Sequence, residues 1–291
     1  KSISSKLITV IGGPHASAFP KETIEETDID FVVMGEGEHR LLELTRSLDA
    51  GVEPRIQGVL QSEKDMELLK PSRRSRISFL PELDNLPLPA YDMVDMERYF
   101  YLQRKGYSSR PRSKGNRSVS ILTSRGCPHQ CVFCSIQATM GYKWRHNTAD
   151  YVKRHLTYLI DHYQIDYVHF EDDNFTHDPV RYEAILDALI ELPESIRWDT
   201  PNGVRGDTWT LDLVKKTKTS GCQYLIVAIE SGVQRVIDEV VKKRLDLKKV
   251  DDLMRFCKSE KLKLFAFYVA GLPGESRDDL QATMTYALER F

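Results

Sequence analysis

The sequence predicts an α/β protein built on parallel sheets, with part of a doubly wound domain followed by a partial β/α barrel. Short apolar runs alternate with amphipathic runs over residues 6–49, and again from residue 118 to the end of the chain. This alternation is typical of parallel strands joined by helices. In the second stretch, polar motifs follow the apolar runs directly, as they do where loops leave the strands of a barrel.

Residues 1–51 are expected to form the C-terminal part of a doubly wound, Rossmann-like domain. The expected strands are 7–13 and 28–35, and the expected helices are 20–27 and 38–48. Two strands cannot bury both faces of a parallel sheet, so further strands are expected before residue 1. The final run, 276–290, has helical spacing and no stop signal. We therefore expect a chain that is truncated at both ends.

Residues 52–117 differ in composition and are expected to be an interdomain linker. They are rich in proline and charge, as in "KPSRRSRISFLPELDNLPLPAYD". The part from 104 to 117 is basic and contains Tyr107, so contact with RNA is one hypothesis. The chain as a whole carries 41 basic and 43 acidic side chains, which favours a solvated linker over a nucleic-acid surface.

Residues 118–291 are expected to form a partial β/α barrel whose last strand is missing. The expected strands are 118–124, 166–172, 196–202, 223–231 and 263–271. The expected helices are 148–163, 178–190, 208–219, 233–260 (broken near Arg244) and 276–290. The chemistry of such barrels lies on the loops that leave the C-terminal ends of the strands.

The composition predicts a globular protein of the cytoplasm. Hydrophobic residues make up 41% of the chain and charged residues 29%, with a net charge of −2. These values predict no general attraction to nucleic acid or to an anionic membrane. No apolar run has the length of a membrane span, and no signal peptide opens the chain. Three of the five cysteines lie within eight positions, which suits a metal in a reducing compartment.

The clustered cysteines are Cys127, Cys131 and Cys134, directly after the first barrel strand. Three thiolates can hold three irons of a 4Fe–4S cluster, which needs four ligands, and leave the fourth iron open to a small chelating molecule. A structural zinc site would need four protein ligands, and His129 would strain the loop if it were the fourth. Cys222 and Cys257 stand alone and are expected in the core.

The spacing C-x3-C-x2-C after the first barrel strand, with the aromatic Phe133 before the third cysteine, resembles the radical S-adenosylmethionine (SAM) superfamily. The resemblance implies that Cys127, Cys131 and Cys134 hold a 4Fe–4S cluster and that the amino and carboxylate groups of SAM chelate the open iron. It also implies that Phe133 packs near the adenine. One electron, from a reductant such as flavodoxin or ferredoxin, would cleave SAM to a 5′-deoxyadenosyl radical.

Two strand ends carry acidic candidates for SAM binding. After the second strand, Asp172 or Asp173 would accept hydrogen bonds from the SAM ammonium group, as the corresponding motif does in the superfamily. Capping is the alternative, but Asp178 before Pro179 already fits the N-cap of the next helix. Glu230, in "AIESG" after the fourth strand, would bind the ribose hydroxyls.

The remaining two ends carry a cation and a glycine turn. Arg205, in "TPNGVR", would pair with the SAM carboxylate as a bidentate fork. Gly271, in "AGLPGES", resembles the glycine-rich turn beside the adenine. The structural alternatives are a simple turn at Asn202-Gly203 and a Pro-Gly type II turn followed by Glu275.

The segments "VIGGPHAS" and "FVVMGEGE" resemble the second half of a cobalamin-binding domain, which precedes the barrel in cobalamin-dependent radical SAM enzymes. The linker motif "LDNLPLPAYD" is also similar to that subgroup. Glycines would let the backbone approach a flat, bulky ligand. The candidate cobalamin-binding residues are Gly12, Gly13, Gly35, Glu36 and Gly37. Any doubly wound domain with glycine turns is the structural alternative.

These resemblances imply a cobalamin-dependent (B12-binding) radical SAM enzyme that transfers a methyl group to an unactivated carbon or phosphorus. The substrate would be a small molecule, such as a biosynthetic intermediate. One alternative keeps the cofactors and changes the reaction to cyclisation, ring contraction or another rearrangement. Another, from a different class, is a zinc-binding module that contacts RNA through residues 104–117.

Overall fold

The structure, a computed structural model, describes residues 4, 6–26, 28–62, 64–65, 79–107 and 116–290. Most of the basic stretch 104–117 and part of the expected linker therefore lie outside the described residues. Two compact units make up the chain. The first unit comprises residues 1–81, 126–128 and 134–144, and the second comprises 82–125, 129–133 and 145–291.

The first unit contains a three-stranded sheet in the order β1-β2-β3. Its strands are β1 (Val10–Gly12), β2 (Phe31–Val33) and β3 (Val59–Leu60), with β1 parallel and β3 antiparallel to β2. Its helices are α1 (Pro14–Ala18), α2 (Pro20–Ile24), α3 (Glu38–Asp49) and α6 (Ile136–Thr139). Strand β2 is buried, whereas Val10 and Ile11 of β1 are exposed. Strand β1 is thus an edge strand here.

The expected linker contributes more packed structure than its composition indicated. Strand β3 belongs to the first sheet, and the second unit begins with two short 3-10 turns, η1 (Leu83–Asn85) and η2 (Tyr91–Met93), followed by α5 (Met96–Arg104). Met96 and Phe100 of α5 lie one helical turn apart and are buried in the core of the second unit. Apolar residues at this spacing mark a packed helix.

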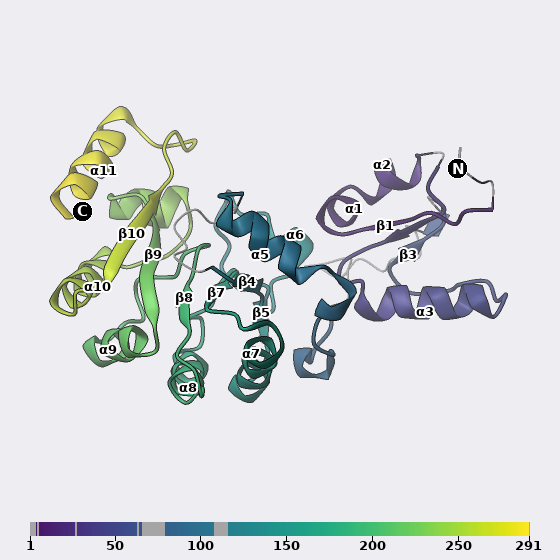
Figure 1. Ribbon diagram of the computed structural model, residues 1–291. Helices are drawn as coiled ribbons and strands as arrows, with labels where there is room; N and C mark the ends of the chain where they lie inside the picture. The colour runs from purple at the N-terminus through teal and green to yellow at the C-terminus, as the bar shows by residue number, and fades with distance from the viewer. Residues whose placement is uncertain are drawn as a thin grey trace. The chain divides into compact units, whose positions relative to one another are not determined.

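The second unit contains a five-stranded parallel sheet in the order β4-β7-β8-β9-β10. These strands are β4 (Ser118–Ile121), β7 (Tyr167–Phe170), β8 (Arg197–Asp199), β9 (Cys222–Glu230) and β10 (Lys263–Tyr268). The helices between and after them are α7 (Ala149–Tyr163), α8 (Pro179–Ile190), α9 (Leu211–Thr219), α10 (Leu247–Ser259) and α11 (Arg277–Arg290). Helices α7 to α10 lie side by side along one face of the sheet (Figure 1). The expected strand–helix alternation is confirmed.

The side chains of strand β7 point alternately to the two faces of the sheet. Val168 and Phe170 belong to the same hydrophobic core as residues of α7 and α8. Tyr167 and His169 therefore point to the opposite face. There, the Tyr167 hydroxyl and His169 Nδ1 lie 3.0 and 2.8 Å from the two carboxylate oxygens of buried Asp199. The C-terminal ends of these strands carry the candidate site residues.

The first barrel strand is shorter than expected, and the break expected near Arg244 is present. Strand β4 ends at Ile121 rather than at Ser124, because the chain turns into β5 (Ser124–Arg125), which pairs antiparallel with β6 (Arg145–His146). The break expected near Arg244 is wider than a kink. A short π-helix, η3 (Val236–Val240), is followed by Lys242 and Arg244, both with positive φ. Within the described residues, no helix is long and apolar enough to cross a membrane.

Candidate functional site

A tight backbone turn begins the cysteine loop in the first unit. Gly126 has a φ of +82°, and a Cβ there would lie 2.5 Å from the Lys143 carbonyl oxygen and 2.9 Å from that of Met140. Only glycine fits this position without moving the backbone. The next residue, Cys127, donates its backbone N–H to the Gly141 carbonyl, 3.2 Å away. The geometry of the first cysteine is therefore set by close packing against residues 140–143.

The five cysteines fall into two chemical classes. Cys127 and Cys131 are half-buried and Cys134 is exposed, whereas Cys222 and Cys257 are buried. Burial raises the pKa of Cys257 to about 12 and that of Cys222 well above its usual value. Both therefore remain neutral core thiols, as predicted. The three loop thiols are at least partly accessible, which fits ligation of iron.

The structure does not bring potential metal ligands together. Within the described residues, the three loop cysteines included, no group of three or more His, Cys, Asp or Glu residues is arranged to hold a metal ion. His129, between the first two cysteines, lies with its ring 6.0 Å from that of His177. Burial, with the charge of Arg205 and His177, lowers the pKa of His129 to about 4. The imidazole is thus neutral at pH 7.

Asp172, one of the two carboxylates predicted to bind SAM, bonds the start of the cysteine loop. The carboxylate is buried and accepts hydrogen bonds from the Thr123 amide (3.1 Å), the Thr123 hydroxyl (2.8 Å) and the Ser124 hydroxyl (2.5 Å). Buried Arg181 donates to the Thr123 carbonyl and hydroxyl oxygens. Burial raises the pKa of Asp172 despite the nearby Arg181. This carboxyl group therefore links the segment after β7 to residues 123 and 124, which precede the cysteine loop.

Asp173, the next residue, is exposed and makes no hydrogen bond or ion pair with the described residues. Although the residue is exposed, surrounding protein atoms partly desolvate its carboxylate. This desolvation, together with the charge of Asp172, raises the pKa of Asp173 to about 6. The cap of the following helix is supplied by Asp178, which accepts from the backbone N–H groups of Val180 (2.9 Å) and Arg181 (3.2 Å), as predicted. Asp173 is therefore the carboxylate of this strand end that remains available.

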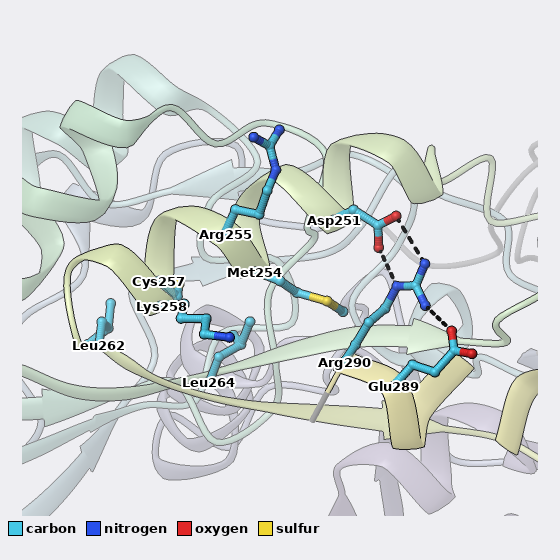
Figure 2. Close-up of a pocket in the computed structure, with 9 residues that line it drawn as sticks. All are labelled: Asp251, Met254, Arg255, Cys257, Lys258, Leu262, Leu264, Glu289 and Arg290. Atoms are coloured by element: carbon cyan, nitrogen blue, oxygen red, sulfur yellow. Dashed lines mark hydrogen bonds and ion pairs between the residues drawn. The ribbon is translucent and has the colours of Figure 1, made fainter. Parts of the chain in front are cut away.

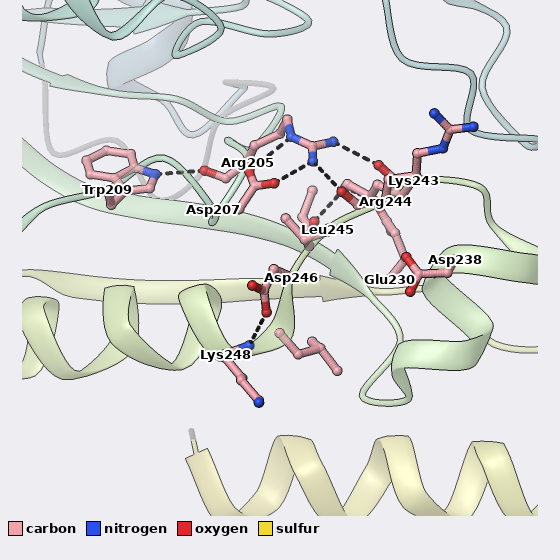
Figure 3. A network of polar contacts seen from close by, with 12 residues as sticks. Arg205, Asp207, Trp209, Glu230, Asp238, Lys243, Arg244, Leu245, Asp246 and Lys248 are labelled. Atoms are coloured by element: carbon pink, nitrogen blue, oxygen red, sulfur yellow. Dashed lines mark hydrogen bonds and ion pairs between the residues drawn. The ribbon is translucent and has the colours of Figure 1, made fainter.

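Arg205 has its fork directed at Asp207 rather than at open space (Figure 3). Its Nε and Nη2 atoms lie 3.1 and 2.7 Å from the two carboxylate oxygens. Nη1 and Nη2 also donate to the carbonyls of Lys243 and Arg244, both at 3.1 Å. The bidentate geometry was predicted, but its partner is a side chain two residues away. The sequence contained that signal in "VRGD", where the acid follows the arginine closely.

Glu230 forms a buried ion pair with Lys243, a residue the sequence analysis missed. The Lys243 ammonium lies 2.7 Å from Glu230 Oε1 and 2.5 Å from the Ala228 carbonyl oxygen. Both side chains are less than a tenth exposed. Glu230 also has a positive φ of 72°, which is rare for a residue with a Cβ. Lys243 lies in the run "KKR", where nothing in the sequence distinguishes the buried cation from its exposed neighbours.

The turn at Gly271 is held by the side chain of Glu275. Glu275 Oε2 accepts from the backbone N–H groups of Gly271 (2.7 Å) and Leu272 (3.2 Å). Gly271 and Gly274 have φ values of +84° and +97°, in agreement with the turn that was the structural alternative here. A Cβ on Gly271 would meet no atom within 4 Å, so its surface is open.

Two glycine turns of the first unit are tied together by Ser17, which the sequence analysis also missed. The Ser17 hydroxyl donates to the Gly13 carbonyl (2.8 Å) and accepts from the Gly35 N–H (2.8 Å). A Cβ on Gly12 would lie 3.2 Å from the Val33 carbonyl oxygen, whereas one on Gly13 would meet nothing within 4 Å. The turns after β1 and β2 thus form one hydrogen-bonded arrangement.

The other two residues of the second turn differ in role. Glu36 is buried, and its Oε2 accepts from the Leu80 amide at 2.6 Å, so this carboxylate supports the backbone. Gly37 precedes α3 as its N-cap, with a helical φ of −89° and ψ of −16°. A Cβ there would be 3.9 Å from Val33 Cγ1, so Gly37 presents open backbone at the end of β2.

A surface pocket of about 510 Å³ lies between α10, β10 and α11 (Figure 2). The ion pair between Asp251 and Arg290, 2.8 Å long, borders it. Cys257 lines it, but none of the predicted cofactor-binding residues does. The pocket is therefore separate from the strand ends that carry the candidate site.

Residues 121–287 match the family model of the radical SAM superfamily. The match covers more than half of the chain. The chain therefore belongs to this superfamily. The predicted 4Fe–4S cluster and SAM are confirmed as the cofactors of its class.

The chain is also similar in sequence to proteins that are named as methyltransferases. The chain is 33% identical over 314 residues to cytidylyl-2-hydroxyethylphosphonate methyltransferase of Streptomyces wedmorensis, covering 99% of this chain and 57% of that protein. It is 30% identical over 289 residues to the uncharacterized methyltransferase PH0819 of Pyrococcus horikoshii, covering 99% and 59%. The chain thus spans less than three fifths of the length of these relatives.

A solved structure shares the fold. The radical SAM methyltransferase TsrM from Kitasatospora setae, with cobalamin and a [4Fe-4S] cluster bound, superimposes with a TM-score of 0.75 at 17% identity. The comparison covers 98% of this chain and 53% of TsrM. At this identity the likeness concerns the fold, and it confirms the predicted combination of a doubly wound part and a partial radical SAM barrel.

Proposed function

We propose that the chain is the cofactor-binding part of a cobalamin-dependent radical SAM methyltransferase that acts on a small molecule. The observation that carries this proposal is the coexistence of the C-x3-C-x2-C loop and the Ser17-linked glycine turns in one chain. The similarity to a phosphonate methyltransferase along 99% of the chain supports methyl transfer. When bound, the cluster and SAM supply a 5′-deoxyadenosyl radical, and cobalamin supplies the methyl group.

The residues have separate roles in this proposal. Cys127, Cys131 and Cys134 hold the cluster, and Phe133, which is 46% exposed, offers an aromatic surface to the adenine. Asp173 binds the SAM ammonium group, and the open backbone at Gly271 borders the adenine. The cobalamin-binding residues are the predicted set of Gly12, Gly13, Gly35, Glu36 and Gly37. A protein reductant such as flavodoxin or ferredoxin supplies the electron.

The proposal is tested with the complete protein, reconstituted anaerobically with iron, sulfide and cobalamin. SAM carrying a deuterated methyl group and a chemical reductant are added, and the cobalamin is analysed by mass spectrometry. We expect the deuterated methyl group on cobalamin, together with 5′-deoxyadenosine. Production of 5′-deoxyadenosine by a cobalamin-loaded enzyme that never labels its cobalamin would contradict methyl transfer. That result would favour cyclisation or another rearrangement.

SAM affinity is expected to fall as the pH drops below about 6, because protonation of Asp173 removes the charge that attracts the SAM ammonium group. Asp173→Asn should weaken SAM binding roughly tenfold or more and remove this pH dependence, since a charged hydrogen-bond partner contributes about 1.5–3 kcal/mol. Titration of the cluster-loaded protein with SAM between pH 5 and 8 measures both effects.

The adjacent carboxyl group provides the matched control. Asp172→Asn should lower the free energy of unfolding by about 1–3 kcal/mol, because donors around a buried carboxylate lose their acceptor, and this variant should keep the pH dependence of SAM binding. If SAM affinity follows Asp172 and ignores Asp173, the assignment of the two carboxylates is reversed.

A further inference from the structure

We propose that Arg205 and Lys243 are positioning residues for the cluster-binding thiol of Cys131, and that Glu230 assists Lys243 in this role. They would act on the cysteine loop through the segment 236–245 rather than by contacting SAM. The inference rests on superfamily membership and on contacts within the second unit.

The cysteine loop is attached to this segment at one backbone carbonyl. The Val132 N–H donates to the Val241 carbonyl oxygen at 3.1 Å. Cys131, the preceding residue, packs against the buried apolar cluster that contains Val236, Val241 and Leu272. The position of the Cys131 thiol therefore depends on where residue 241 is held.

The chain after residue 241 has a conformation that needs support. Lys242 and Arg244 have φ values of 60° and 54°, and residues with a Cβ adopt this left-handed region only at a cost. Arg205 lies across this turn and donates to the carbonyls of Lys243 and Arg244 (Figure 3). Asp207, held by the other edge of the guanidinium, fixes the direction of the fork.

The Lys243 side chain ties the same turn to the end of strand β9. Its ammonium bonds both Glu230 and the Ala228 carbonyl, and its backbone N–H donates to the Ile237 carbonyl at 3.0 Å. A buried ion pair is costly to break from one side, because a lone charge is left without water. Segment 236–245 is thus held by two sets of contacts. Lys243 binds strand β9, and Arg205 binds the carbonyls of Lys243 and Arg244.

This arrangement leaves Arg205 little capacity for a ligand. A guanidinium group has five N–H donors, and four hydrogen bonds from Arg205 already go to Asp207, Lys243 and Arg244. Pairing with the SAM carboxylate as a fork would require the guanidinium to release Asp207 or the turn. The contacts therefore favour support of the loop over direct binding of SAM.

The experiment uses the complete protein with a reconstituted cluster, before any SAM is added. Iron release to a chelator and the EPR spectrum of the reduced cluster are compared among variants. We expect Arg205→Ala and Lys243→Met to release iron roughly tenfold faster or more, as for loss of a charged hydrogen bond, and to show an altered EPR spectrum without SAM. Lys243→Arg, which keeps the charge and the reach, should restore iron retention.

Two further variants keep the outcome interpretable. Arg255→Ala removes an exposed arginine that pairs with Asp252 on α10, and it should change neither readout. If Lys243→Met unfolds, the double variant Lys243→Met/Glu230→Gln avoids a lone buried charge and should still release iron faster. Normal iron retention and EPR spectra in all variants, with loss of SAM affinity alone, would overturn the proposal. Absence of methyl transfer would not affect these readouts.

Discussion

Replacing Cys127, Cys131 or Cys134 by alanine is expected to remove the iron–sulfur cluster from the reconstituted protein. In the proposed site each thiolate would bind one iron and the fourth iron would have no protein ligand, so two thiolates would not retain a 4Fe–4S cluster. Iron and sulfide content should fall close to background in each single variant. The broad absorption at about 400 nm from thiolate-to-iron charge transfer should disappear with them. This is the largest effect that any single substitution in the chain should have on cofactor content.

Cys222→Ala and Cys257→Ala are the matched controls. Both thiols are buried in the hydrophobic core of the second unit, and burial raises the pKa of each, so neither supplies a thiolate at neutral pH. These variants should keep full iron content. A triple variant of the loop cysteines that reconstitutes normally would contradict the assignment, as would a native site that contains only zinc.

The barrel strands could be predicted because local sequence determines them. Runs such as "YVHF" and "YLIVAI" are short, apolar and β-branched, and each is followed by a helix with its own cap, such as Asp178. The pairing of neighbouring strands then follows from the right-handed β/α connection. The same reasoning identified the loops after the strands, although β4, β8 and β10 each end three residues earlier than expected.

Side-chain partners at those ends could not be predicted, because they come from distant parts of the chain. Asp172 is 49 residues from Thr123 and 48 from Ser124. The alternation of side chains in "FEDDNF" places Asp172 and Asp173 on opposite sides of the strand, but it does not show which side has hydrogen-bond donors. Glu230 was expected to face ribose, but a lysine 13 residues later neutralises it. In each case the sequence identified a carboxylate at the right strand end, and the three-dimensional contacts decided whether it was available.

The backbone conformation of the glycine turns in the first unit could not be predicted from the sequence either. From the sequence alone, replacing Gly13 by valine would test cobalamin binding sterically, since a strand tolerates a β-branched residue. Its φ of +94° excludes that substitution, because valine would strain the backbone whatever ligand binds nearby. A loss of cobalamin in such a variant could reflect misfolding. Gly37 is the better position, since its helical φ suits any residue.

Gly37→Leu is expected to abolish cobalamin binding by the complete protein while its cluster and SAM binding remain. The new side chain would extend from the open end of β2 into space where the structure places no atom closer to the Cβ than Val33 Cγ1, at 3.9 Å. The backbone would not be strained, and replacing glycine at an N-cap costs only about 1 kcal/mol. Cobalamin affinity should fall by at least about tenfold, or about 1.4 kcal/mol, as measured from the visible spectrum after desalting.

Ala50→Leu is the control for this variant, because it adds a comparable exposed side chain at the opposite end of α3. It should bind cobalamin as the unmodified protein does, and both variants should retain iron and SAM. If Gly37→Leu binds cobalamin with unchanged affinity, the corrin ring does not lie over the turn after β2, and the five glycine-turn residues lose their assignment. If the unmodified complete protein takes up no cobalamin at all, the first unit is an ordinary doubly wound domain. The proposal of methyl transfer through cobalt would then have to be abandoned. The assignment of the cluster and SAM would be unaffected, because it depends on the cysteine loop alone.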